Sequence, residues 1–161
     1  MCESLGAEDR GVLVQRDTYF NVRDGRLKLR DEEGSPAQLI AYQRADLAGQ
    51  RTSHYRLIEI AEAEDLRAAL AATLGIKAVV AKERRLFLWE GNVRIHLDAV
   101  EDLGSFIEFE AVASADSDLG REQDQARQLR EAFGIDDADV IGGSYCDLIT
   151  AEKAGRVPSG R

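Results

Sequence analysis

The chain has 161 residues, a formal net charge of −9, and 44% hydrophobic residues. This length is typical of one globular domain with its own core, and the composition argues against a disordered chain. The negative charge argues against nucleic acid or an anionic membrane surface as a partner, because the average field repels phosphate groups. A local basic site is still compatible with it.

The two cysteines, Cys2 and Cys146, form neither a metal-binding motif nor a disulfide framework. Their pattern favours a reducing compartment, and we expect the protein to be cytoplasmic. We expect neither a signal peptide nor a membrane span, because no stretch approaches the ~20 apolar residues that a span needs. We expect one domain over 1–153 and a flexible tail over 154–161.

The opening residues 4–7 are typical of the end of a helix, and segments typical of β-strands follow. Glycine-containing turns at Asp24-Gly25, Glu90-Gly91-Asn92 and Leu103-Gly104 separate several of these segments, which favours antiparallel hairpins. Strands are predicted at about 11–21, 25–31, 37–44, 54–61, 77–90, 92–100 and 105–113.

Three helices are predicted among and after the strands. Leu66, Leu70 and Leu74 fall on one helical face, and Gly75 stands where a C-terminal cap belongs. A second helix is expected over about 117–133, and a short third one over about 144–153. The apolar stripe of the second helix would consist of Leu119, Ala126, Leu129 and Phe133. The predicted class is therefore α+β, an antiparallel sheet or barrel with external helices.

Charged residues alternate with apolar ones along several strands, so each set shares one face of its strand. Most of the basic residues lie on the early and middle strands, whereas the carboxylates lie on the last two. The charged set comprises Arg26, Lys28, Arg30, Arg44, Lys82, Arg84, Arg94, His96, Asp98, Glu108 and Glu110.

This alternation alone is also typical of a one-sided sheet whose charged face is solvated. Two features favour an enclosed face instead. The signs of the charges are segregated, although solubility alone would mix them. In addition, the helices must pack on the apolar face, so a sheet that curls into a barrel would enclose the charged face.

Cations enclosed in a lumen repel one another and need a polyanion as their partner. A triphosphate has a suitable size and charge. The carboxylates cannot bind a triphosphate directly, but they can hold a hard divalent cation that bridges protein and phosphate.

An ordered series of segments carries a resemblance to a known family. The segments are 15–20 (QRDTYF), 25–30 (GRLKLR), 39–44 (LIAYQR), 51–55 (RTSHY), 82–85 (KERR), 94–98 (RIHLD), 103–110 (LGSFIEFE) and 144–149 (SYCDLI). This series resembles the CYTH superfamily, which includes class IV adenylate cyclases, thiamine triphosphatases and inorganic tripolyphosphatases. The resemblance covers about residues 3–153.

The resemblance implies an eight-stranded antiparallel β-tunnel that binds the triphosphate group of a small molecule together with Mg²⁺ or Mn²⁺. By position, the phosphate ligands would be Lys28, Arg30, Arg44, Lys82, Arg84 and Arg94, with Arg26 and Arg51 as weaker candidates. The metal ligands would be Asp98, Glu108 and Glu110.

One departure concerns the family's first strand, which carries the pattern Glu-x-Glu-x-Lys. This sequence contains that pattern nowhere. Glu108 and Glu110 have the spacing of the two carboxylates, but Val112 stands where the lysine would be. We therefore expect about seven strands, and a sheet that is open along one edge or closed by a partner chain, as in a homodimer.

The sequence leaves three functions open. An enzyme would hydrolyse a triphosphate or cyclise ATP, and both reactions need the same cationic cradle and metal. A second possibility is a catalytically weak nucleotide or polyphosphate sensor, and a third is a structural domain without a ligand. No residue is assigned as catalytic, and His96 is a candidate for either a general base or a neutral hydrogen-bonding group.

Overall fold

The computed structural model describes residues 1–44, 53–114 and 116–155, without the side chains of 44 and 53–55. Along the described residues, four strands are followed by one helix, three further strands and two final helices, in agreement with the predicted α+β class. The strands are β1 (Glu8–Phe20), β2 (Arg26–Glu32), β3 (Ala37–Arg44), β4 (Ser53–Ile60), β5 (Ile76–Trp89), β6 (Val93–Val100) and β7 (Gly104–Ala111). The helices are α1 (Ala63–Leu74), α2 (Gly120–Phe133) and α3 (Tyr145–Gly155), with short 3₁₀ turns η1 (Glu3–Leu5) and η2 (Asp137–Asp139).

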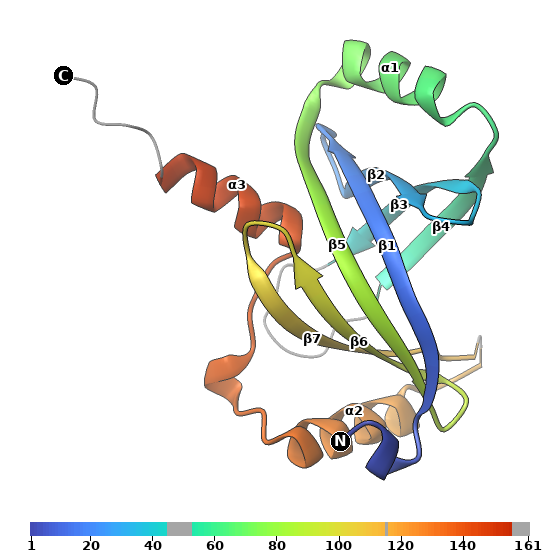
Figure 1. The fold of residues 1–161 in the computed structure, drawn as a ribbon, viewed down its shortest axis with the longest axis vertical. Coiled ribbons are helices and arrows are strands. Elements are labelled where there is room, and N and C mark those ends of the chain that lie inside the picture. The colour runs from blue at the N-terminus through green and yellow to red at the C-terminus, as the bar shows by residue number, and fades with distance from the viewer. Residues whose placement is uncertain (45–52, 115, 156–161) are drawn as a thin grey trace.

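The seven strands form one antiparallel sheet in the order β4-β3-β2-β1-β5-β6-β7, which confirms the predicted number of strands (Figure 1). β1 and β5 are the longest strands and lie next to each other at the centre of the sheet. Within the described residues, β4 and β7 are the two edges of this sheet.

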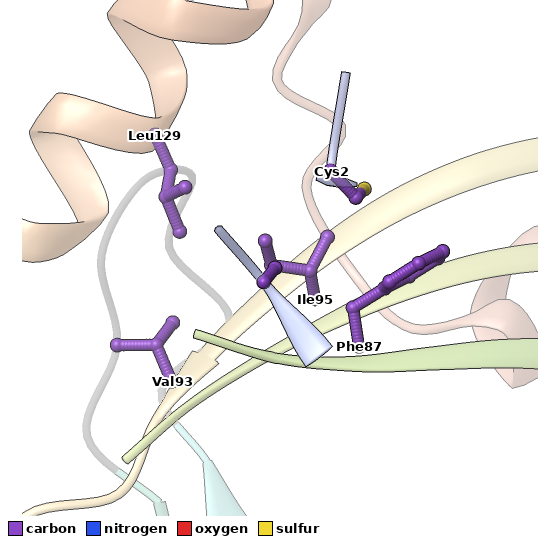
Figure 2. Close-up of a cluster of buried hydrophobic side chains, with 6 residues drawn as sticks. Cys2, Phe87, Val93, Ile95 and Leu129 are labelled. Carbon is purple, nitrogen blue, oxygen red and sulfur yellow. The ribbon is translucent and has the colours of Figure 1, made fainter. Parts of the chain in front are cut away.

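One face of the sheet is apolar and carries two of the helices. On β5 and β6, Phe87, Val93 and Ile95 pack against Leu129 of α2 and against Cys2 near the N-terminus (Figure 2). α1 contacts β1, and Arg67 of α1 pairs with Asp31 on this same face of β2. We call this the outer face; burial of its large apolar side chains is what attaches α2 to the sheet.

The opposite face, which we call the inner face, carries the alternating charged residues. α3 packs at one end of it, where Cys146 and Ile149 join Ala78, Val80 and Val100 in a second apolar cluster. Next to this helix, several charged side chains of the inner face are also buried; Lys28 is only 8% exposed and Asp98 only 2%. The strong bend of the sheet provides this burial (Figure 1).

The helices follow the prediction with one correction. α1 ends at Gly75 as predicted, but α2 begins at Gly120, and Leu119 is its N-cap with a left-handed φ of +66°. The side chains of Ser117 and Asp118 accept hydrogen bonds from the backbone N–H groups of Leu119 and Gly120. These local bonds form a turn in place of the first helical turn, so Leu119 does not belong to the helical stripe.

α3 extends through Gly155, and the rest of the predicted tail, 156–161, lies outside the described residues. No helix in the described part of the chain is long and apolar enough to cross a membrane.

The turn that leads into β2 gives a test of the fold. Gly25 has a φ of +72°, and a Cβ atom there would lie 2.7 Å from the carbonyl oxygen of Tyr42. Gly34, with a φ of +78°, has open space around it. We expect Gly34→Ala to cost about 1–2 kcal/mol of unfolding free energy, from backbone strain alone. Gly25→Ala should cost clearly more, because the backbone of β3 must also move. Urea denaturation of both variants checks this, and equal losses would contradict it.

Candidate functional site

The inner face brings most of the predicted site residues together. The strand register places Asp17 of β1 beside Arg30 of β2, and places Arg84 of β5 beside Asp98 of β6. On β6 and β7, His96 is opposite Glu108, and Arg94 is opposite Glu110. Directly paired residues point to the same side of a sheet, so these charges form one continuous surface.

Asp17 is the centre of this surface. Its side chain is 1% exposed. The Lys28 ammonium donates to its Oδ2 at 2.8 Å, and Arg30 donates to both oxygens at 2.7 and 2.8 Å. The Nζ atom of Lys82 lies 3.8 Å from Oδ2. One carboxylate therefore neutralises part of the charge of three cations from two different strands.

The pKa values of these groups follow from burial and mutual charge. Burial alone would raise the pKa of Asp17, but Lys28 and Arg30 hold it well below its usual range. Burial, only partly opposed by Asp17, lowers the pKa of Lys28. Burial also lowers the pKa of Lys82 to about 7, with Asp17 opposing the shift and Arg84 adding to it. Lys82 is thus the cation of this group that titrates near neutral pH.

A second cluster forms around Arg84. Its Nε and Nη2 atoms donate to the two oxygens of Asp98 at 2.7 and 2.6 Å, and Nη2 also donates to Glu108 at 3.1 Å. The hydroxyl group of Tyr145, at the start of α3, donates to Asp98 at 2.9 Å. Burial and the Asp98 charge raise the pKa of Tyr145 far above its usual range, so this hydroxyl stays protonated as a donor.

The carboxylates of β7 lie at the more open part of the inner face. Glu108 and Glu110 have side chains that are 42% and 34% exposed, and both lie near His96. The distances from the His96 ring nitrogens are 3.4 Å to Glu108 and 3.8 Å to Glu110. Although burial opposes it, the bond from His96 and the charge of Arg84 hold the pKa of Glu108 below its usual range. Arg94 pairs with Glu110 at 3.2 Å.

Of the remaining predicted ligands, Arg26 is the one whose side chain the structure describes. Arg26 donates to Asp147 of α3 at 2.7 Å, which places it at the helix-covered end of the inner face. Arg44 is the last residue of β3 and its side chain is outside the described part, while Arg51 lies wholly outside the described residues.

A divalent cation fits only part of the predicted metal set. Within the described residues no three acidic, histidine or cysteine side chains converge as metal ligands do. Both oxygens of Asp98 are already engaged by Arg84, and Oδ2 also by Tyr145. Glu108 and Glu110 are accessible and share one face of β7, and Mg²⁺ beside a phosphate chain commonly uses only one or two carboxylates. These two residues fit such a cation, and Asp98 as a ligand stays a prediction.

The sequence did not reveal the part that Asp17 and Tyr145 play. Asp17 has the alternation parity of Gln15 and Tyr19, and all three are buried on the inner face. This alternation along β1 was the sequence signal that could have placed Asp17 on the inner face. The Oε1 atom of Gln15 is buried without a hydrogen-bond partner among the described residues, so this face also holds an unused acceptor.

Comparison with known proteins agrees with the sequence resemblance. The CYTH domain family matches residues 2–145 of this chain. The comparison with curated proteins finds no match.

Solved structures with the same fold come from archaea and a bacterium. The PH1012 protein of Pyrococcus horikoshii has a TM-score of 0.74 at 22% identity, over 91% of this chain and 88% of that one. A conserved hypothetical protein of Pyrococcus furiosus has a TM-score of 0.75 at 20% identity, over 90% and 88%. A candidate adenylate cyclase of Vibrio parahaemolyticus has a TM-score of 0.72 at 18% identity, over 92% and 87%. At these identities the likeness concerns the fold alone.

The central carboxylate can be tested by stability. Asp17→Asn leaves Lys28 and Arg30 buried without their counter-charge, and we expect a loss of about 3–5 kcal/mol in unfolding free energy at neutral pH. Because the pKa of Asp17 is lower in the folded than in the unfolded chain, this contribution is complete above about pH 4 and is lost as the pH falls through the folded value.

Asp9→Asn on the same strand is the control, because Asp9 makes an exposed pair with Arg85 on the outer face. Chemical denaturation at neutral and acidic pH measures both variants. Similar small losses for the two would show that Asp17 does not hold the cluster together.

Proposed function

Because the chain belongs to the CYTH domain family, a family of triphosphate-binding tunnels, we propose that it binds a triphosphate with Mg²⁺ or Mn²⁺ on the inner face of its sheet. We propose further that it acts on this ligand, as a phosphohydrolase or as an adenylate cyclase of the class IV type. Both reactions use the same cradle for the phosphate chain.

The observation that carries the proposal is an excess of buried cations on one face. Lys28, Lys82 and Arg84 are 7–8% exposed, and Arg30 has a side chain that is 16% exposed. The fully buried carboxylates among them are only Asp17 and Asp98, as far as the described residues go. Uncompensated positive charge in a site of low dielectric is costly unless an anion binds there.

The arginines can bind a ligand without leaving their carboxylates. Asp17 and Asp98 each contact only the Nε and Nη2 atoms of their arginine. A guanidinium has five N–H donors in a fork, so, as far as the described residues go, the Nη1 groups of Arg30 and Arg84 are left for phosphate oxygens. Arg94, which is half exposed, could add a donor at the open part of the face.

Glu108 and Glu110 are the residues that would hold the divalent cation. When bound, such an ion neutralises charge on the phosphate chain and polarises a phosphorus–oxygen bond. The contribution of this chain's own residues is to align the phosphates through the cations of β2 and β5. His96 lies between the two carboxylates and is buried, which suits a group that orients them.

Binding without turnover is the second candidate. It is favoured by the state of Asp98, whose oxygens are held by Arg84 and Tyr145, and by the lack of a three-ligand cluster among the described residues. Release of phosphate or pyrophosphate from a triphosphate, abolished by a chelator and restored by Mg²⁺, would decide for the enzyme.

Ligand binding can be measured through thermal stability. Tripolyphosphate with Mg²⁺ should raise the melting temperature, since a ligand that binds only the folded state stabilises it. Arg84→Gln should reduce this shift strongly and Arg94→Gln less so, each measured against the variant's own melting temperature. Arg85→Gln should leave the shift unchanged, because Arg85 is on the outer face and pairs with Asp9.

Sulfate at matched ionic strength is the control for general anion screening. Shifts of the same size with sulfate, or an equal loss in Arg85→Gln, would argue against a triphosphate site on the inner face.

Lys82 predicts a pH dependence of binding. Its pKa of about 7 means that it loses its proton as the pH rises above neutrality, so the affinity for tripolyphosphate should fall between about pH 6 and pH 9. The folding stability of the free protein has the opposite pH dependence. The unfolded chain binds this proton more tightly, so the Lys82 contribution to stability rises with pH over the same range.

Lys82→Arg keeps the charge at every accessible pH and should remove this part of the dependence. Calorimetric titrations of the wild type and of Lys82→Arg across the pH range give the test. The ratio of their two affinities for tripolyphosphate is independent of the ligand's own protonation. Parallel curves would show that Lys82 does not contact the phosphate chain.

A further inference from the structure

A recess of about 440 Å³ opens on the inner face beyond the cationic clusters, away from α3. Its volume lies within the range of small-molecule sites in proteins. The recess is lined by Arg10, Leu86, Leu88, Asn92, Arg94 and Val112.

The strand register makes this recess continuous with the cationic surface. Leu86 is opposite His96, and Leu88 is opposite Arg94. Along β5, Leu86 follows Arg84 by two residues on the same face, a separation of about 7 Å. A molecule whose phosphates contact Arg84 can therefore extend into the recess without crossing a strand.

The chemistry of the lining changes abruptly at this point. From Lys82 and Arg84 the inner face of β5 passes to Leu86 and Leu88, which belong to neither of the two apolar core clusters. Val112, after the end of β7, is 41% exposed. Apolar side chains that line an accessible hollow next to a polar site are typical of a ligand pocket rather than of a protein core.

Two arginines border these apolar residues. Arg94 pairs with Glu110, and Arg10 pairs with Glu8, and both side chains are nearly half exposed. A guanidinium that keeps its carboxylate can still offer its flat face to an aromatic ring. The combination of aliphatic walls and exposed guanidinium groups suits a flat heteroaromatic group better than a sugar or a third phosphate.

We propose that this recess binds the aromatic organic group of a nucleoside triphosphate, or of an organic triphosphate of similar shape, whose phosphates lie on the cationic clusters. The inference rests on the proposed function. It selects an organic triphosphate over inorganic tripolyphosphate as the substrate class, because tripolyphosphate has no group to fill the recess and leaves its leucines exposed to water.

The test compares two ligands on three variants by calorimetric titration. ATP and tripolyphosphate, each with Mg²⁺, are titrated into the wild-type protein, Leu88→Gln and Val112→Gln. A control, Val12→Gln, alters a 59% exposed valine on the outer face of β1. Wild type should bind ATP more tightly than tripolyphosphate. Leu88→Gln should weaken ATP about tenfold, because a buried apolar contact is lost, with tripolyphosphate unchanged.

Val112→Gln should act in the same direction with a smaller change, and its partial exposure makes it safe for folding if Leu88→Gln lowers the melting temperature. Val12→Gln should change neither affinity. If both recess variants leave ATP binding unchanged, or weaken the two ligands equally, the recess is not the subsite although the phosphate site stands. If the wild type binds neither ligand, the proposed function fails and this inference fails with it.

Discussion

The ion pairs of one buried aspartate make the interior of this protein possible. Asp17 lies on the central strand β1 and accepts hydrogen bonds from Lys28 and Arg30 of β2, while Lys82 of β5 is 3.8 Å away. Without a carboxylate at this point, cations from neighbouring strands would face one another in a site of low dielectric. With it, the sheet can bend around them. A buried network of charges is stable only when its members are paired. This requirement explains why Lys28, Arg30 and Lys82 all lie close to Asp17.

The apolar packing supports this arrangement from both sides. The outer face buries Phe87, Val93 and Ile95 under α2, so the sheet has a conventional core that does not involve the charges. Among the described helices, α3 is the one that packs on the inner face, at one end. Its first residue, Tyr145, contacts both the apolar cluster and the charged residues. The ring of Tyr145 packs on Phe106 with centroids 5.1 Å apart, and its hydroxyl donates to Asp98. Movement of α3 would therefore disturb the Arg84 cluster as well as the apolar contacts.

Much of the fold followed from the sequence because alternation fixes which residues share a face. The strand segments, the glycine turns and the cap at Gly75 agree with the structure, and Lys28, Arg84 and His96 are all on the inner face. Alternation does not fix register, so it could not show that Asp98 would be opposite Arg84 and engaged by it rather than open to a metal ion. It also could not show that Leu119 would be in a turn, because that depends on local side-chain bonds.

The four buried cations of the two clusters share only two buried carboxylates, Asp17 and Asp98, and this sharing has a consequence for selectivity. A ligand cannot simply enter an empty cationic cavity; it must share donors that Asp17 and Asp98 already use in part. A small anion would reach only one or two of these donors. Its binding free energy would be small, because the carboxylates already neutralise part of the charge of these donors. If the proposed function holds, a phosphate chain with about four negative charges would contact Lys28, Arg30, Lys82 and Arg84 together. Its binding free energy would then grow with each contact while both carboxylates stay in place. Under the proposed function, the internal ion pairs would therefore favour long polyanions over short ones. The length of the charged surface, rather than the strength of any one contact, would set this preference.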